Sequence, residues 1–143
     1  MPYTFNKFNC LVEDLAKGVH NLSTGTITVA LCAAANAPVA TNTVLANLTQ
    51  ISYTNLSARV VTVTSCAQTS GTLKWILQDL VLTASTGDVA AFRYVVLLND
   101  TPTSPADPLI GWYDYGADTI LHGANGDYIT LDFDGTNGVF QLA

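Results

Sequence analysis

The stretch VAAFRYVVLLND, from Val89 to Asp100, decides the fold class. From Val89 to Leu98 every residue except Arg93 is apolar or aromatic, and β-branched and aromatic residues favour strands. A strand with one face in water alternates apolar and polar side chains, but this run does not alternate. The stretch therefore predicts a central β-strand that is covered on both faces.

Shorter strands are predicted on both sides of this stretch. GTITVALCA (25–33) and ARVVTVTSCA (58–67) alternate apolar and polar residues, and TLKWILQDLVLTA (72–84) does so with a change of phase at Gln78–Asp79 that predicts a bulge or bend. LIGWYDYG, DTILH, DYITLDFD and GVFQLA complete a set of roughly eight or nine strands. This pattern predicts a mainly β protein, an antiparallel β-sandwich that is jelly-roll-like.

One segment has the spacing of a helix. Apolar residues recur every three or four positions in the N-terminal region, which predicts one amphipathic helix over about 4–20; they are Phe5, Phe8, Val12, Leu15 and Val19. Thr4 is the expected N-terminal cap, and Gly18 or His20–Asn21 the expected end, where His20 would complement the helix dipole. We expect residues 1–143 to form a single domain that includes this N-terminal arm and helix.

Proline-rich stretches and Asn–Gly pairs predict where the loops and turns lie. NDTPTSPADP (99–108) holds three prolines and predicts a long loop, and residues 33–55 predict an extended excursion. Asn125–Gly126 and Asn137–Gly138 are strong signals for tight hairpin turns. Together they predict a three-stranded meander at the C-terminus.

The charge of the chain excludes several partners. The 143 residues carry a net charge of −6, and the five basic residues are scattered. Nucleic acids and anionic membranes require clustered basic side chains, so we expect neither as a direct partner. Only 11 % of residues are charged, which makes the surface easy to desolvate and favours a place in an assembly.

There is no signal-peptide pattern, so we expect the chain to remain in the cytosol or to leave by a signal-independent route.

The stretch LDFDGTNGVF (131–140) most resembles a chemical site. It fails the EF-hand calcium pattern at three positions: Thr136 stands where an acidic or amide ligand is needed, Asn137 where a glycine is needed, and Ala143 where a glutamate is needed. Asp132 and Asp134 are spaced to share one strand face, which permits a catalytic pair but favours a solvent-facing strand that leads into a hairpin.

No other motif carries chemistry. His20 and His122 are too few for a zinc site, and Cys10, Cys32 and Cys66 predict free thiols rather than a disulfide framework. We therefore expect no enzyme activity, no catalytic or metal-binding residue and no cofactor. GWYDYG (111–116) gathers three aromatic residues, which indicate core packing, a sugar-stacking platform or a protein-docking surface.

Several stretches resemble a known family. FNCLVEDLAKGVHNL, APVATNTVLANLTQI, SARVVTVTS, FRYVVLLNDT, PLIGWYDYG and LDFDGTNGV are similar, in this order, to small virion structural proteins of tailed bacteriophages, of the capsid decoration or cement type. The resemblance implies a β-sandwich subunit on the outer capsid surface that clamps neighbouring major capsid proteins. It also implies assembly in the bacterial host cytoplasm, which agrees with unpaired cysteines.

Exposure arguments give a set of expected contact residues. We expect self-association as a dimer or trimer, and contacts through the N-terminal arm, the proline loop and the aromatic cluster; the residues are Tyr3, Phe5, Phe8, Pro102, Pro105, Trp112, Tyr113 and Tyr115. Three alternatives stay open: a tail or head-to-tail connector component, a surface carbohydrate-binding module that uses Trp112 and Tyr115, and a small hydrolase that uses Asp132 or Asp134.

Overall fold

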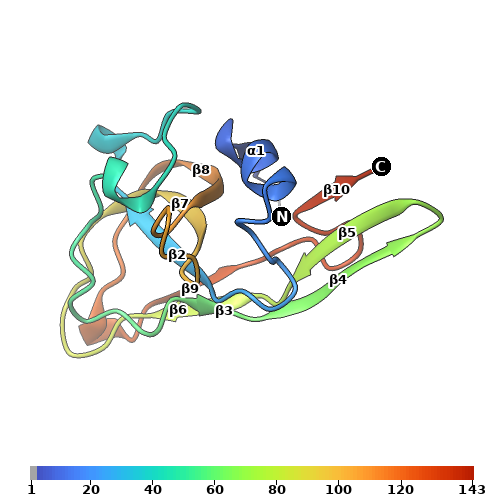
Figure 1. The fold of residues 1–143 in the computed structure, drawn as a ribbon. Coiled ribbons are helices and arrows are strands. Elements are labelled where there is room, and N and C mark those ends of the chain that lie inside the picture. Colours follow the sequence, from blue (N-terminus) through green and yellow to red (C-terminus); the bar gives the residue numbers. More distant parts are fainter. Residues whose placement is uncertain (1–2) are drawn as a thin grey trace.

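The first sheet of the computed structural model, which describes residues 3–143, has five antiparallel strands in the order β1-β8-β7-β2-β3 (Figure 1). These strands are β1 (Asn6–Lys7), β2 (Ile27–Cys32), β3 (Val60–Val61), β7 (Phe92–Asn99) and β8 (Leu109–Thr119). The long apolar strand β7 lies at the centre of the sheet, as its sequence predicts. The prediction of a mainly β, antiparallel protein with one helix near the N-terminus is confirmed.

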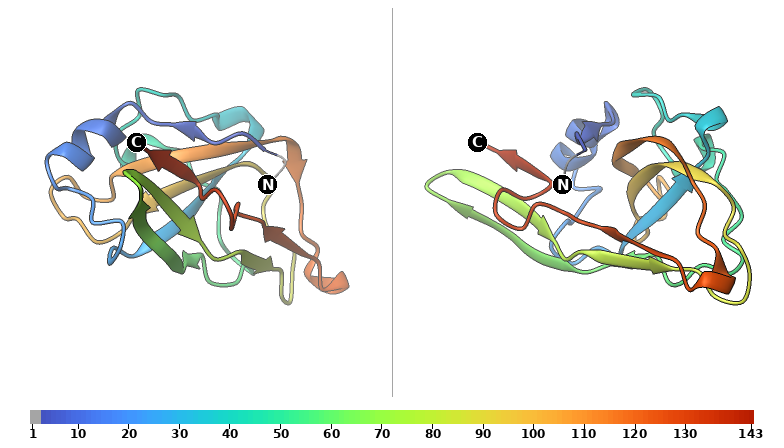
Figure 2. Two further views of the ribbon diagram at one scale, coloured as in Figure 1. Left: turned by 90° about the vertical axis from the view of Figure 1, so that its right-hand side faces the viewer. Right: turned by 180° about the vertical axis from the view of Figure 1, so that it is seen from behind.

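Two smaller sheets form the opposite layer, so that the arrangement is sandwich-like. One has the order β10-β5-β4, with β4 (Val63–Thr69), β5 (Thr72–Leu77) and β10 (Phe140–Leu142), and the other pairs β6 (Leu80–Thr83) with β9 (Tyr128–Leu131). The break between β5 and β6 falls at Gln78–Asp79, where the sequence predicts a bulge or bend. Asp79 accepts a hydrogen bond from the Phe133 N–H there (2.9 Å), which links the two small sheets. The β4–β5 hairpin extends past the first sheet (Figures 1 and 2).

Both faces of the first sheet are covered, which explains its continuous apolar strands. The larger hydrophobic cluster lies between the layers and includes Val95 and Leu97 of β7 with Trp75 of β5. A second cluster covers the other face, where Leu45 and Leu48 from the long connection between β2 and β3 pack against it. That connection holds two 3₁₀ helices, η1 (Ala34–Asn36) and η2 (Leu45–Asn47). All of β2 is buried for the same reason, although its sequence alternates.

The helix is much shorter than predicted. α1 spans Cys10–Ala16, while the residues before it form β1, which pairs with β8. The Phe5 ring packs so closely on Gly111 that a Cβ there would lie 2.2 Å from it. Strand pairing and this contact override the helical spacing, because intrinsic propensity is weak beside tertiary packing. Asn9, not Thr4, precedes the first turn, and it makes no side-chain cap hydrogen bond.

The predicted C-terminal meander is wrong. β9 pairs with β6 and β10 pairs with β5, so neither turn joins two strands that pair with each other. The two turns themselves are present: η3 (Gly123–Asn125) ends at Gly126, and both Gly126 and Gly138 have positive φ. Each turn passes the chain to a different sheet, because the apolar faces of β9 and β10 are buried against partners that precede them in sequence.

Candidate functional site

The aromatic cluster of β8 is divided between the two faces of the first sheet. Trp112 belongs to the outer hydrophobic cluster, where its ring lies 4.6 Å from that of Phe8. Tyr113 and Tyr115 belong to the cluster between the layers, and Tyr115 stacks on Tyr3 at 4.1 Å. Because Trp112 and Tyr115 lie on opposite faces, they do not form one sugar-stacking platform.

The expected contact residues of the N-terminal arm mostly serve the fold. Phe8 and Tyr113 are buried, with 0 % and 3 % exposed, and Phe5 is half-buried between Tyr113 and Phe140. These rings attach the arm to β8 and β10. Tyr3 is 36 % exposed, so it is the most open to a partner of the three expected contact residues in the arm.

The proline loop connects β7 and β8, as predicted. Pro105 is exposed and Pro102 is half-buried. The loop is closed by short-range hydrogen bonds, including one from the Thr101 N–H to Asn99 Oδ1 at 3.1 Å. Pro105 is therefore available to a partner.

The two aspartates of LDFDGTNGVF do not lie on a strand, because β9 ends at Leu131. The interpretation of a polar strand face is therefore wrong. Asp134 Oδ1 accepts hydrogen bonds from the N–H groups of Asn137 and Thr136, each at 2.8 Å. These bonds, the one from Asn137 first among them, lower the pKa of Asp134. The carboxylate organises the turn that leads into β10.

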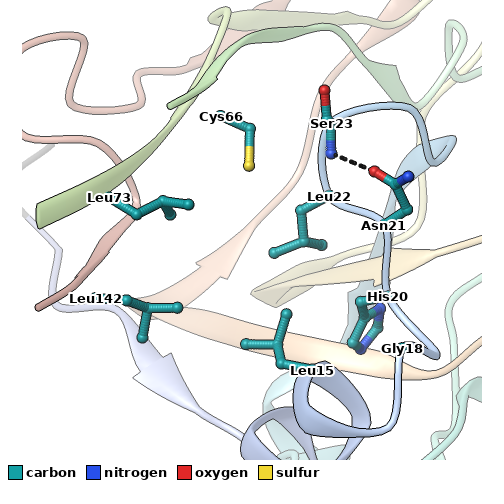
Figure 3. A pocket seen from close by; sticks show the side chains of 9 residues that line it. All are labelled: Leu15, Gly18, His20, Asn21, Leu22, Ser23, Cys66, Leu73 and Leu142. Atoms are coloured by element: carbon teal, nitrogen blue, oxygen red, sulfur yellow. Dashed lines mark hydrogen bonds between the residues drawn. The ribbon is translucent and has the colours of Figure 1, made fainter. Parts of the chain in front are cut away.

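An apolar groove with a volume of about 350 Å³ lies between α1 and the inner face of the β10-β5-β4 sheet. Four leucines from separate elements surround it, with Cys66 of β4 above them (Figure 3); the leucines are Leu15, Leu22, Leu73 and Leu142. We call this feature the leucine groove. Sequence reasoning missed it, because its lining comes from α1, the segment after it, and three strands that are distant in sequence.

His20 lines the right-hand side of the leucine groove (Figure 3). Its side chain is 0 % exposed; Nδ1 lies 3.3 Å from Asn99 Nδ2, and Nε2 has no hydrogen-bond partner among the described residues. Burial lowers the pKa of His20, and the charge of Asp14, 3.9 Å away, only partly opposes this. The prediction that His20 complements the dipole at the helix end is wrong, since His20 lies beyond α1 and burial disfavours its charged form.

This environment gives a pH prediction. In the unfolded chain His20 binds a proton near its ordinary pKa of about 6.5, whereas the folded protein resists protonation. Because the histidine pKa is lower in the folded state, the unfolded state binds more protons once the pH falls toward the unfolded-state pKa. The free energy of unfolding therefore decreases as the pH falls, by at most about 1.4 kcal/mol per pH unit. We expect the free energy of unfolding to fall between about pH 7.5 and 5.5, and to fall less steeply in His20→Gln. Urea denaturation at each pH measures this. Equal slopes for wild type and His20→Gln would contradict the prediction.

Within residues 3–143, no group of three or more His, Cys, Asp or Glu side chains is placed to hold a metal ion. The same residues include no helix with the length and apolarity needed to cross a membrane. No family model matches the chain, and no curated protein or solved structure matches it either. Its function must therefore be inferred from its own residues.

Proposed function

We propose that this protein is a bacteriophage virion structural protein that decorates the outer surface of the capsid and stabilises it. The observation that supports this most is the leucine groove. Leu15, Leu73 and Leu142 leave apolar surface open at one end of the sandwich, where the core of an isolated protein would normally be closed. Such a pocket accepts an apolar anchor side chain from a partner protein.

The proposed partner is the major capsid protein, which would insert an apolar side chain into the leucine groove. A protein that binds only the assembled shell stabilises that shell by mass action, without any chemistry. The low proportion of charged residues reduces the cost of burying the surrounding surface. Self-association as a dimer or trimer would match the symmetry axes of a shell.

The acidity of the chain also supports an outer position. With a net charge of −6 and scattered basic residues, the protein is suited to the outside of a shell filled with DNA rather than to contact with the DNA itself. We propose assembly in the bacterial host cytoplasm, with no direct nucleic-acid or membrane contact and no cofactor.

Particle imaging with a labelled copy tests the proposal. We expect label over the whole head, at on the order of hundreds of copies, as symmetric decoration requires. Label confined to the tail or neck, at a few dozen copies or fewer, would contradict it and support the connector alternative. Glycan binding that is lost in Trp112→Ala would instead support a carbohydrate-binding role.

A matched pair of variants tests the groove. Leu142 is 45 % exposed at the groove and Val81 is 48 % exposed on β6, away from it, so Leu142→Asp and Val81→Asp add the same charge at similar exposure. Because a carboxylate is costly to bury beside an apolar anchor, we expect Leu142→Asp to lose binding to purified capsids and Val81→Asp to keep it. Co-sedimentation measures both. Equal binding by the two variants would show that the groove is not the contact.

A further inference from the structure

Strand β4 differs from every other edge strand in residues 3–143. It has seven residues and forms the edge of the β10-β5-β4 sheet, whereas the strands at the other sheet edges have two to four. A free edge presents a row of unpaired N–H and C=O groups that can pair with another strand. Seven residues give an edge of about 23 Å.

This edge lacks the usual protection against pairing. Its sequence, VTSCAQT, has no proline and no charged residue, and its one irregularity lies at the beginning, between Val63 and Ser65. Ser70 and Gly71, both at positive φ, form the two-residue turn to β5, which makes Thr69 and Thr72 a hydrogen-bonded pair. Because the pattern alternates along the strand, Cys66 and Gln68 direct their N–H and C=O groups away from β5.

The positions of the acidic residues favour a second copy of the chain as the partner of this edge. All 11 acidic residues lie outside positions 15–78, so β4 and β5 belong to the acid-free part of an acidic chain. Two copies with a net charge of −6 repel each other in most orientations. That repulsion is weakest where the β4–β5 hairpins meet, and this hairpin extends past the first sheet (Figures 1 and 2).

We propose that two copies of the chain pair β4 to β4, antiparallel about a two-fold axis. The two three-stranded sheets would then form one six-stranded sheet, with three strands from each copy. This inference deepens the self-association in the proposed function, on which it rests, by naming the strand that carries it. No register places like charges opposite each other, because β4 has none.

Sedimentation equilibrium tests the pairing. A contact built on one strand is small, so we expect a dissociation constant on the order of 10–100 µM. Gln68→Pro removes an outward N–H and should leave the protein monomeric throughout this range. Gln68→Val loses the same side-chain amide, which accepts a bond from the Gly71 N–H, but keeps its own N–H and should still dimerise. Thermal denaturation establishes that both variants fold.

A second pair of variants tests whether β4 carries the dimer contact, even if Gln68→Pro does not fold. Ala67 is exposed on β4, so Ala67→Lys and Ala67→Glu should each weaken dimerisation several-fold through like charges, while their equimolar mixture restores it. Thr130→Lys, at an exposed position of β9, should dimerise as the wild type does. A wild-type monomer at every concentration would overturn the proposal and assign the edge to a different protein. A dimer unaffected by the β4 variants would also overturn it.

These results are independent of particle imaging. A β4 dimer together with label absent from the virion would refute the decoration function and leave the pairing established. Label on the head together with a monomeric protein would support the decoration function and refute the β4 pairing.

Discussion

Trp75→Ala is expected to lower the free energy of unfolding by about 3–5 kcal/mol, which is enough to unfold a marginally stable domain. The Trp75 side chain is fully buried in the cluster between the two layers. Its ring lies 5.4 Å from that of Phe140, and its indole Nε1–H donates to the Leu22 carbonyl at 3.0 Å. Alanine at this position would leave a large cavity and a buried carbonyl without its donor. Urea denaturation followed by circular dichroism measures the loss.

Trp75→Phe separates the two causes. Phenylalanine fills most of the space but cannot donate to the Leu22 carbonyl, so the loss should be smaller, about 1–3 kcal/mol from the unpaired polar group and the remaining gap. Leu22 also lines the leucine groove, so this hydrogen bond connects the core to the groove wall. If Trp75→Ala cost less than about 0.5 kcal/mol, which is the range of ordinary surface changes, Trp75 would not be packed between the two layers.

The fold class could be predicted because double-sided burial leaves a continuous apolar run. In VAAFRYVVLLND that run marks β7, and its two neighbours in the sheet, β2 and β8, are also predicted as strands, β2 from its alternation of apolar and polar residues. The helix boundaries could not be predicted in the same way. Phe5 and Phe8 have helical spacing relative to Leu15, but they are held by β8 and by the outer cluster, contacts that are distant in sequence.

The pairing of the C-terminal strands could not be predicted from the sequence either, because it also depends on contacts between residues that are distant in sequence. Asn137–Gly138 does make a turn, yet a local signal of this kind says nothing about which strand receives the chain afterwards. β10 pairs with β5, because Phe140 packs on Trp75. The leucine groove and the free edge of β4 follow from these distant pairings, so neither could be found before the topology was known.

The groove and the β4 edge both depend on the same structural feature, the extension of the β4–β5 hairpin beyond the first sheet. Past the end of that sheet, the inner face of the hairpin faces α1 and the segment after it, with the groove between them. The outer edge of the same hairpin is β4. One surface would therefore bind an apolar anchor, and the other a second copy, without competition for the same side chains.

Alanine substitution at three glycines tests how closely the turn before β10 approaches β5. Gly138 has φ +82°, and a Cβ there would lie 2.5 Å from the Trp75 carbonyl oxygen, so Gly138→Ala is both strained and obstructed. Gly71 has φ +83° with nothing within 4 Å, and Gly135 has neither constraint. We expect losses in the free energy of unfolding of about 2–4 kcal/mol for Gly138→Ala and about 1–2 for Gly71→Ala. Gly135→Ala should change it by less than about 0.5 kcal/mol.

Urea denaturation of the three alanine variants measures this order. The difference between Gly138→Ala and Gly71→Ala isolates the close approach of the turn to β5, because both glycines have nearly the same φ. The Val139 N–H donates to the same Trp75 carbonyl at 2.7 Å, so any shift that relieves the added methyl group also weakens the bond that starts the β10–β5 pairing. Equal losses at Gly138 and Gly71 would mean that β10 does not approach β5 as described, and the groove would then lose the wall that contains Leu142.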